Sequence, residues 1–211
     1  MMSNSIPVTY PVCELFASVQ GEATWTGRPV IFIRFSGCPL ACTWCDEPRH
    51  RNPALARHLS SDEIIQEIHQ GFPDLKYLVL TGGEPLAVNE LAPLVKKLKA
   101  HGFWIAMETS GVGGSIPEEI DWVTLSPKTD IAESIAKRVD EIKLIIGPQQ
   151  DDEEQKHIQQ WTATKQPVWL QPRSKGNRID PEAVARCFEM VMNSAGRLRL
   201  SLQIHKYMGV Q

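Results

Sequence analysis

The chain has 211 residues, of which 42% are hydrophobic and 22% charged, a composition typical of a globular protein with a core. A complete eight-unit α/β barrel usually needs about 250 residues, so a barrel in this chain would have to be incomplete. The 22 basic and 25 acidic residues leave a formal charge of −3. That balance argues against a large nucleic-acid-binding surface, but it does not exclude a small nucleotide-like ligand.

The chain starts MMSNSIPVTYPVCELF, which lacks the basic and then apolar stretches of a signal peptide. No apolar run approaches the ~20 residues that span a bilayer. We therefore expect a soluble cytoplasmic protein with no direct nucleic-acid or membrane partner. The five cysteines are odd in number and three of them lie close together, which favours a metal site over a disulfide framework.

Seven short apolar runs predict strands buried on both faces, at residues 30–35, 77–80, 103–107, 122–125, 141–146, 168–170 and 198–204. Helical periodicity marks residues 60–70, 88–100, 151–164 and 181–193. Ser60 and Glu63 have the spacing of a capping box, and Asp180 before Pro181 is typical of a helix start. The connections at residues 111–121 and 127–140 look short or irregular.

Strands that alternate with helices indicate βαβ units and a largely parallel sheet. Because six or seven strands fit the pattern, the sequence predicts an α/β fold with an incomplete, open barrel. No Gly/Ser-rich linker divides the chain. We therefore expect one domain over residues 1–211, with a short insert at about residues 47–59.

A cluster of three cysteines directly follows the predicted strand at residues 30–35. Cys38, Cys42 and Cys45 have the spacing C-x3-C-x2-C, so one loop can place three thiolates on three irons of a [4Fe–4S] cluster. The fourth iron then keeps an open coordination position, as a catalytic metal site requires. The alternative is a structural zinc loop with His50 as the fourth ligand, although the second cysteine pair usual in zinc sites is missing from the sequence.

The segment Thr81-Gly82-Gly83-Glu84-Pro85 follows the predicted strand at residues 77–80. Paired glycines at the carboxyl end of a parallel strand let a ligand approach the backbone, at the end of the sheet where α/β folds place their sites. Glu84 adds an anion suited to a ligand ammonium or sulfonium group. Taken alone, the same residues would favour a simple β–α turn.

The two motifs, in this order, resemble the radical S-adenosylmethionine (SAM) superfamily. The resemblance implies that the open iron chelates SAM and that the cluster, reduced by an external donor such as flavodoxin or ferredoxin, cleaves SAM to a 5′-deoxyadenosyl radical. The residues we assign to SAM are Gly82, Gly83, Glu84, Glu108, Thr109, Ser126 and Lys128. A structural ion pair between Glu108 and Lys128 is the alternative for those two residues.

Five further segments, at residues 15–22, 108–111, 126–128, 170–172 and 199–207, narrow the resemblance. Together they are similar to the 7-carboxy-7-deazaguanine synthase family, over nearly the whole chain. Members convert 6-carboxy-5,6,7,8-tetrahydropterin to 7-carboxy-7-deazaguanine with loss of ammonia, a step toward queuosine. The resemblance implies a homodimer and a substrate pocket that contains Gln20, Glu22, Arg34, Thr81, Gln171 and His205.

The residue chemistry of that pocket agrees with a pterin that carries a carboxylate. Amides such as Gln20 donate and accept hydrogen bonds, and the guanidinium of Arg34 binds carboxylates with a two-pronged fork. His205 titrates near neutral pH. Each polar residue alone would be equally consistent with a solvated group or a core hydrogen bond.

One departure from the family pattern follows the last cysteine. Where the family commonly has Asp-Thr, with the threonine next to a magnesium ion, this chain has Asp46-Glu47. A carboxylate is also a ligand for Mg²⁺, so we expect Glu47 to hold Mg²⁺ against the substrate, or else to point away. The runner-up function is a glycyl-radical-activating enzyme, which would act on a protein.

Overall fold

The computed structural model describes residues 8–175 and 178–210. Within them, nine strands form one sheet in the order β11-β8-β7-β6-β5-β4-β2-β1-β3. The seven strands from β11 to β2 pair in parallel. They are β2 (Pro29–Phe35), β4 (Tyr77–Gly82), β5 (Trp104–Thr109), β6 (Trp122–Leu125), β7 (Glu141–Ile146), β8 (Val168–Pro172) and β11 (Leu198–Leu200).

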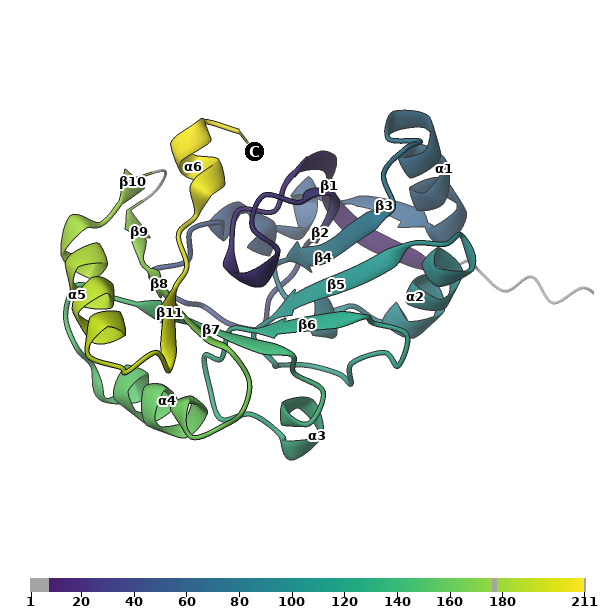
Figure 1. The fold of residues 1–211 in the computed structure, drawn as a ribbon. Coiled ribbons are helices and arrows are strands. Elements are labelled where there is room, and N and C mark those ends of the chain that lie inside the picture. Colours follow the sequence, from purple (N-terminus) through teal and green to yellow (C-terminus); the bar gives the residue numbers. More distant parts are fainter. Residues whose placement is uncertain (1–7, 176–177, 211) are drawn as a thin grey trace, which may run out of the picture.

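Each of these seven strands overlaps one of the seven predicted runs, so the open, mostly parallel α/β architecture is confirmed. Figure 1 shows the sheet as a curve that does not close, with helices along its outer face. The helices are α1 (Ser61–Gly71), α2 (Leu91–Ala100), α3 (Glu133–Ala136), α4 (Asp152–Thr162), α5 (Pro181–Met192) and α6 (Ile204–Met208). None of the helices in the described ranges is long and apolar enough to cross a membrane.

Two strands extend the sheet beyond the prediction. β1 (Thr9–Val19) pairs antiparallel with β2, and β3 (Arg57–Ser60) pairs antiparallel with β1. The segment expected as an insert therefore ends in an edge strand, after two short 3₁₀ helices at Pro48–Arg51 and Pro53–Leu55. β9 (Ser174–Lys175) and β10 (Arg178–Ile179) pair antiparallel in a separate two-stranded sheet. We propose that the whole chain is one domain, because this one sheet contains strands from both ends of it.

The core lies mainly between the sheet and the outer helices. On β2, Ile31, Ile33 and Phe35 point toward the helices, where they join the apolar residues of α1 and α2. The alternate residues Val30 and Phe32 belong to a smaller apolar cluster on the other face. Because strand side chains alternate between faces, the inner face of the barrel is lined by this second set.

The helices α1, α2, α4 and α5 begin and end within about three residues of the predicted limits. The capping box of Ser60 and Glu63 is present at the start of α1. By contrast, α2 begins at Leu91 rather than residue 88, because Glu90 takes a left-handed conformation with φ of 55° that a helix cannot continue through.

The last predicted strand, at residues 198–204, is too long. β11 ends at Leu200, and α6 begins at Ile204. The chain leaves the sheet because the backbone N–H of Ile204 donates to Gly21 O (3.1 Å), which draws this segment toward the loop after β1. In Figure 1, α6 accordingly lies over the open side of the curve, near that loop.

Candidate active site

A cavity of about 260 Å³ opens at the carboxyl ends of the parallel strands. It is lined by every residue that the sequence analysis assigns to the cluster, to Mg²⁺, to SAM or to the substrate. These residues come from segments that lie far apart in the chain. The cavity brings them to one place because parallel strands end at the same edge of a sheet.

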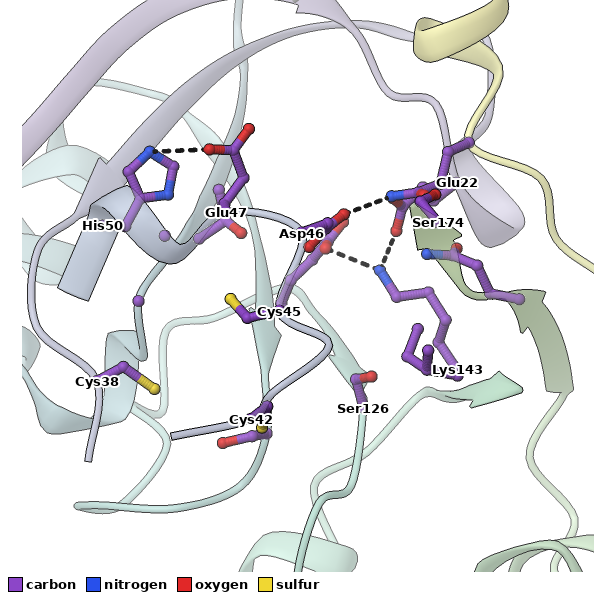
Figure 2. A pocket seen from close by; sticks show the side chains of 18 of the residues that line it. Glu22, Cys38, Cys42, Cys45, Asp46, Glu47, His50, Ser126, Lys143 and Ser174 are labelled. Carbon is purple, nitrogen blue, oxygen red and sulfur yellow. Dashed lines mark hydrogen bonds and ion pairs between the residues drawn. The ribbon is translucent and has the colours of Figure 1, made fainter. Parts of the chain in front are cut away.

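The three cysteines of the motif lie on one loop at the cavity wall (Figure 2). Cys38, Cys42 and Cys45 are free and partly buried. Burial raises the pKa of the Cys38 and Cys45 thiols. The loop is fixed against the turn after β4, because Glu84 N donates to Gly37 O (2.9 Å).

Glycine is required at the contact between this loop and the turn. Gly83 N donates to Phe35 O (2.9 Å), and a Cβ atom added at Gly83 would collide with the carbonyl of Gly37. The close approach of the two backbones therefore excludes any side chain at Gly83. It explains why the Gly-Gly pair and the cysteine loop occur together.

The cysteine loop fits an iron–sulfur cluster better than a single zinc ion. A cluster takes one thiolate per iron, whereas zinc needs its four ligands to converge on one point. Among the described residues, no group of three or more His, Cys, Asp or Glu side chains could hold a single ion. His50, the expected fourth zinc ligand, instead directs its Nε2 toward Glu14 (3.5 Å) and, as Figure 2 shows, toward Glu47 (3.9 Å).

The carboxylate of Glu84 holds the turn after β4 to the end of β5. Only 1% exposed, it accepts hydrogen bonds from Leu86 N (3.0 Å), Thr109 Oγ1 (2.5 Å), Ser110 N (2.8 Å) and Ser110 Oγ. The sequence predicts that this anion meets a ligand cation, but the structure commits its oxygens to protein donors. The side chain of Glu84 thus shapes the cavity wall.

Glu108 and Lys128 both line the cavity but do not form the ion pair considered as an alternative. Lys128 Nζ donates to Ser126 O (2.9 Å) and Ser126 Oγ (2.6 Å), and it lies 5.1 Å from the centre of the Trp44 ring. Burial, helped by the nearby charge of Lys143, lowers the pKa of Lys128 to about 8. Lys128 therefore faces the cavity without a carboxylate partner, whereas the two oxygens of Glu108 accept from Gln20 Nε2 (2.8 Å) and Lys143 Nζ (2.9 Å).

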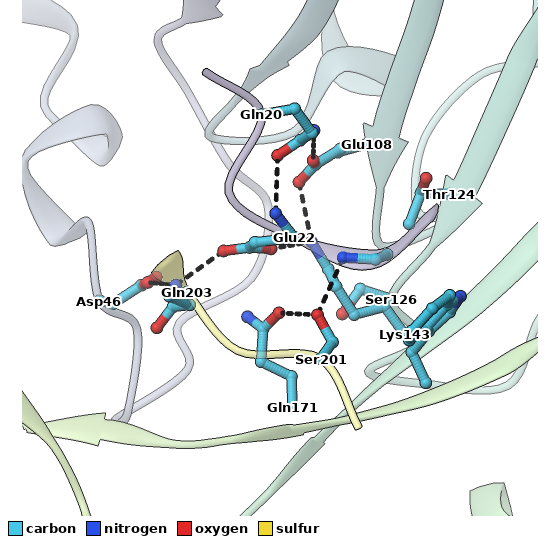
Figure 3. Close-up of polar contacts among 12 residues, drawn as sticks. Gln20, Glu22, Asp46, Glu108, Thr124, Ser126, Lys143, Gln171, Ser201 and Gln203 are labelled. Carbon is cyan, nitrogen blue, oxygen red and sulfur yellow. Dashed lines mark hydrogen bonds and ion pairs between the residues drawn. The ribbon is translucent and has the colours of Figure 1, made fainter. Parts of the chain in front are cut away.

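Lys143 on β7 is the main site residue that the sequence analysis misses. Its side chain is 5% exposed, and its ammonium bridges the carboxylates of Glu22 and Glu108 (2.9 Å to Glu108 Oε2; Figure 3). Burial alone would lower the pKa of Lys143, but the two carboxylates raise it well above its usual value. Burial would likewise raise the pKa of Glu22, but Lys143 and Gln203 lower it. The lysine thus keeps Glu22 ionised inside the cavity.

A second charged cluster surrounds Arg34 on β2. Its Nη1 lies 3.5 Å from Glu14 Oε2 and 3.6 Å from Glu47 Oε1, and Arg49 lies 3.3 Å from Glu47 Oε2. The Glu47 carboxylate is therefore turned toward protein cations. The Nε atom of Arg34 is buried, without a hydrogen-bond partner in the part of the chain that the structure describes.

The C-terminal segment brings the remaining predicted residues to the cavity. His205 packs so closely on Gly21 that a Cβ atom there would collide with its ring. Burial lowers the pKa of His205, although the charge of Glu22 opposes the shift. Gln171 on β8 accepts from Ser201 Oγ (3.2 Å; Figure 3). Both predicted substrate residues are thus held by a neighbour from a distant segment.

Asp46 and Gln203 also line the cavity and were not singled out as site residues. Gln203 Nε2 donates to Asp46 Oδ2 (2.9 Å), and Lys206 Nζ lies 3.0 Å from the same oxygen. Burial would raise the pKa of Asp46, but Lys206 and Gln203 outweigh it and lower the value to about 2. Asp46 and Gln203 are 157 positions apart in the chain, and nothing in their amino-acid types predicts that they meet.

Comparison with known proteins agrees with the geometry. The family model of the radical SAM superfamily matches residues 32–129. A Synechocystis sp. protein named 7-carboxy-7-deazaguanine synthase is 33% identical over 100% of this chain and 98% of its own length. The protein of that name from Bacteroides thetaiotaomicron is 37% identical over 94% of this chain and 97% of its own length.

A solved structure is similar as well. The crystal structure of QueE from Escherichia coli superposes with a TM-score of 0.75 at 29% identity, over 92% of this chain and 94% of that one. Sequence identity above 30% over nearly the whole length, together with the shared fold, leads to one assignment. The chain belongs to the 7-carboxy-7-deazaguanine synthase family of the radical SAM superfamily.

Proposed function

We propose that this chain converts 6-carboxy-5,6,7,8-tetrahydropterin to 7-carboxy-7-deazaguanine with loss of ammonia, as a lyase of queuosine biosynthesis. The observation that carries the proposal is the shared cavity. The three cysteines, the glycine turn and the polar residues Gln20, Glu22, Gln171 and His205 all line it. A SAM-derived radical formed at the cysteines would therefore arise next to a site suited to a flat, polar ring.

When bound, the [4Fe–4S] cluster and SAM supply a 5′-deoxyadenosyl radical for hydrogen abstraction at C6 of the pterin, ahead of ring contraction. We propose that Cys38, Cys42 and Cys45 hold the cluster. The N–H groups of Gly83 and Glu84 already donate hydrogen bonds to Phe35 O and Gly37 O. A ligand at this turn would thus meet carbonyl oxygens, which accept from an ammonium group such as that of SAM.

The remaining SAM contacts that we propose come from the neighbouring strand ends. Ser126 and Lys128 follow β6, and Glu108 and Thr109 end β5. Lys128 presents a cation that suits a ligand carboxylate, and hydroxyl and carboxylate oxygens suit ribose hydroxyls. The hydroxyl of Thr109 already donates its hydrogen to Glu84. It would therefore bind SAM only as a hydrogen-bond acceptor.

We propose that the pterin binds between Glu22 and Arg34. An ionised carboxylate at Glu22 accepts from the amino and N–H groups of an aminopyrimidinone edge. At the other end of the ring, the guanidinium of Arg34, whose side chain lines the cavity, would bind the substrate carboxylate. Gln20 and Gln171 add amides that both donate and accept, and Thr81 and His205 complete the pocket.

The bridging magnesium ion is a finer proposal. In the structure, the Glu47 carboxylate pairs with Arg34 and Arg49. To bind Mg²⁺ together with the substrate carboxylate, Glu47 would have to leave these two arginines. Glu47→Ala should then remove the response of substrate KM to added Mg²⁺, and Glu47→Thr should restore it. An unchanged response in Glu47→Ala would exclude this side chain as the ligand.

The surroundings of the reaction are also proposals that rest on the family. We propose flavodoxin or ferredoxin as the electron donor, and a homodimer as the working state. A reducing compartment such as the cytoplasm suits free cysteines and a reduced cluster. The glycyl-radical-activating alternative is not favoured, since the relatives named above share one other name.

The test is an anaerobic assay of the reconstituted enzyme with SAM, a reductant and the pterin deuterated at C6. We expect 7-carboxy-7-deazaguanine to form and deuterium to enter SAM or 5′-deoxyadenosine. Cys42→Ala should abolish SAM cleavage, whereas Cys13→Ala, at a cysteine outside the motif, should retain it. Turnover without any label transfer would refute the C6 step, and full activity of Cys42→Ala would refute the radical assignment.

A further inference from the structure

The C-terminal segment, residues 201–208, lies against the mouth of the cavity and is fastened there by side chains from distant parts of the chain. Ser201 and Gln203 are 3% and 4% exposed. Ser201 Oγ accepts from Ala23 N (2.9 Å), and Ile204 N donates to Gly21 O (3.1 Å). These contacts bind the segment to the loop after β1.

Gln203 uses all of its hydrogen-bonding capacity in this position. Its Nε2 donates to Glu22 Oε1 (2.8 Å) and Asp46 Oδ2 (2.9 Å), while its Oε1 accepts from Ser174 Oγ (2.5 Å) and Lys206 Nζ (2.9 Å). An amide has two N–H donors and two acceptor lone pairs, so the set is complete. Only one orientation of the side chain satisfies all four partners, as Figure 3 shows in part.

Asp46 connects this amide to the cysteine loop. It directly follows Cys45, which we assign to the cluster, and it receives both Gln203 Nε2 and Lys206 Nζ on one oxygen. The side chain of Lys206 is 13% exposed and that of Asp46 is 41% exposed, so the ion pair lies at the edge of the cavity, partly in contact with water. Hydrogen bonds to an ionised group of this kind are stronger than neutral ones.

We propose that Asp46 and Gln203 form a latch that fastens the C-terminal segment over the cavity. Through Gln203, Asp46 fixes the segment that carries His205, and the same amide holds Glu22. Because Asp46 directly follows Cys45, the latch connects the cysteine loop to the wall on the substrate side. Asp46 and Gln203 are positioning residues in this scheme, and the part that concerns the substrate rests on the proposed function.

The test compares hydrogen exchange of residues 201–210 in reconstituted variants. Gln203→Glu keeps the shape of the side chain but replaces both donors with a carboxylate facing Asp46 and Glu22. We expect the amides of Ile204 and Lys206 to exchange at least about tenfold faster. Gln159→Glu, an exposed change of the same charge on α4, is the matched control and should leave both rates unchanged.

A second variant separates the latch from a general loss of stability. Adding Asp46→Asn to Gln203→Glu reverses the polarity of the contact, because the amide introduced in place of Asp46 would then donate to the new carboxylate. Exchange should slow again, although repulsion from Glu22 leaves the recovery partial. Equal exchange in Gln203→Glu, Gln159→Glu and the unchanged enzyme would overturn the latch.

The substrate part has its own readout. The latch predicts that KM for the pterin rises about tenfold in Gln203→Glu, with a smaller change in kcat. Faster exchange with an unchanged KM would keep the latch but overturn its role in positioning the substrate residues. Where Gln203→Glu does not accumulate, Asp46→Asn alone removes one acceptor charge and should accelerate exchange in the same direction.

Discussion

Replacing Lys143 with methionine should lower the free energy of unfolding, because it leaves buried carboxylates in the cavity without their cation. Lys143→Met keeps most of the apolar stem but removes the ammonium that lies between Glu22 and Glu108. The side chain of Glu22 is 10% exposed, so its carboxylate would lose its cation without gaining water. Removing one partner of a buried ion pair typically costs about 3–5 kcal/mol. Because m-values in urea are about 1–3 kcal/mol per molar, the midpoint should fall by roughly 2 M.

The loss should depend on pH in a direction that the structure sets. With Lys143 present, the pKa of Glu22 is lowered, so its contribution to stability is present above the unfolded pKa of 4.5 and is lost in acid. Without the lysine, burial raises the pKa of Glu22. Its contribution is then present below the unfolded pKa and is lost as pH rises through the raised value. The difference between Lys143→Met and the unchanged chain should therefore widen as the pH rises above the unfolded pKa of 4.5.

The assay is urea unfolding of the cluster-free chain, followed by tryptophan fluorescence at several pH values. Lys156→Met is the matched control, because Lys156 pairs with Asp130 (2.6 Å) where both side chains are mostly exposed. Exposed pairs contribute about 0–1 kcal/mol. Adding Glu22→Gln to Lys143→Met should recover part of the loss. Equal midpoints for Lys143→Met and Lys156→Met at the alkaline end of the range would refute the reasoning.

Three further changes have expected outcomes. Gly83→Ala should lower the iron bound per chain, because its Cβ atom meets the Gly37 carbonyl, whereas Gly71→Ala has open space and should not. Glu141→Gln should cost about 2–3 kcal/mol in urea unfolding, since this buried carboxylate accepts from two tryptophan N–H groups and three donors of threonines. Asp46 has a pKa lowered to about 2, so its stabilising effect is present above its usual pKa of 3.8 and disappears as pH falls through 2. Acid unfolding of Asp46→Asn should lack that component.

The parallel strands and their helices could be predicted because local patterns encode them. Residues 30–35 and 77–80 are continuous apolar runs, as strands covered on both faces require. β1 escaped prediction because it lies between β2 and the edge strand β3, where most of its side chains are only partly buried. It also contains Pro11 and a register shift between Val12 and Glu14, which interrupt any regular alternation.

The location of the candidate site could be predicted because its sequence motifs lie at the carboxyl ends of strands. Gly82 and Thr109 end β4 and β5, and topology alone gathers such positions at one edge. The use of the side chains was less predictable. Glu84 was expected to face a ligand, but four donors from its own and the neighbouring turn take its carboxylate. A motif therefore indicates where an anion lies more securely than what it binds.

Lys143 had a signal that the apolar character of its strand obscured. Glu141 and Lys143 are two residues apart in the run EIKLII, so they share one face of β7. In a strand buried on both faces, charges are tolerated only where partners meet them, and that face had to be the inside of the barrel. Their partners, Thr24 and Glu22, lie on the loop after β1, more than a hundred residues earlier. One strand thus holds that loop at two points, through Glu141 at Thr24 and through Lys143 at Glu22. The two contacts keep Glu22 at the cavity, where a substrate would meet it.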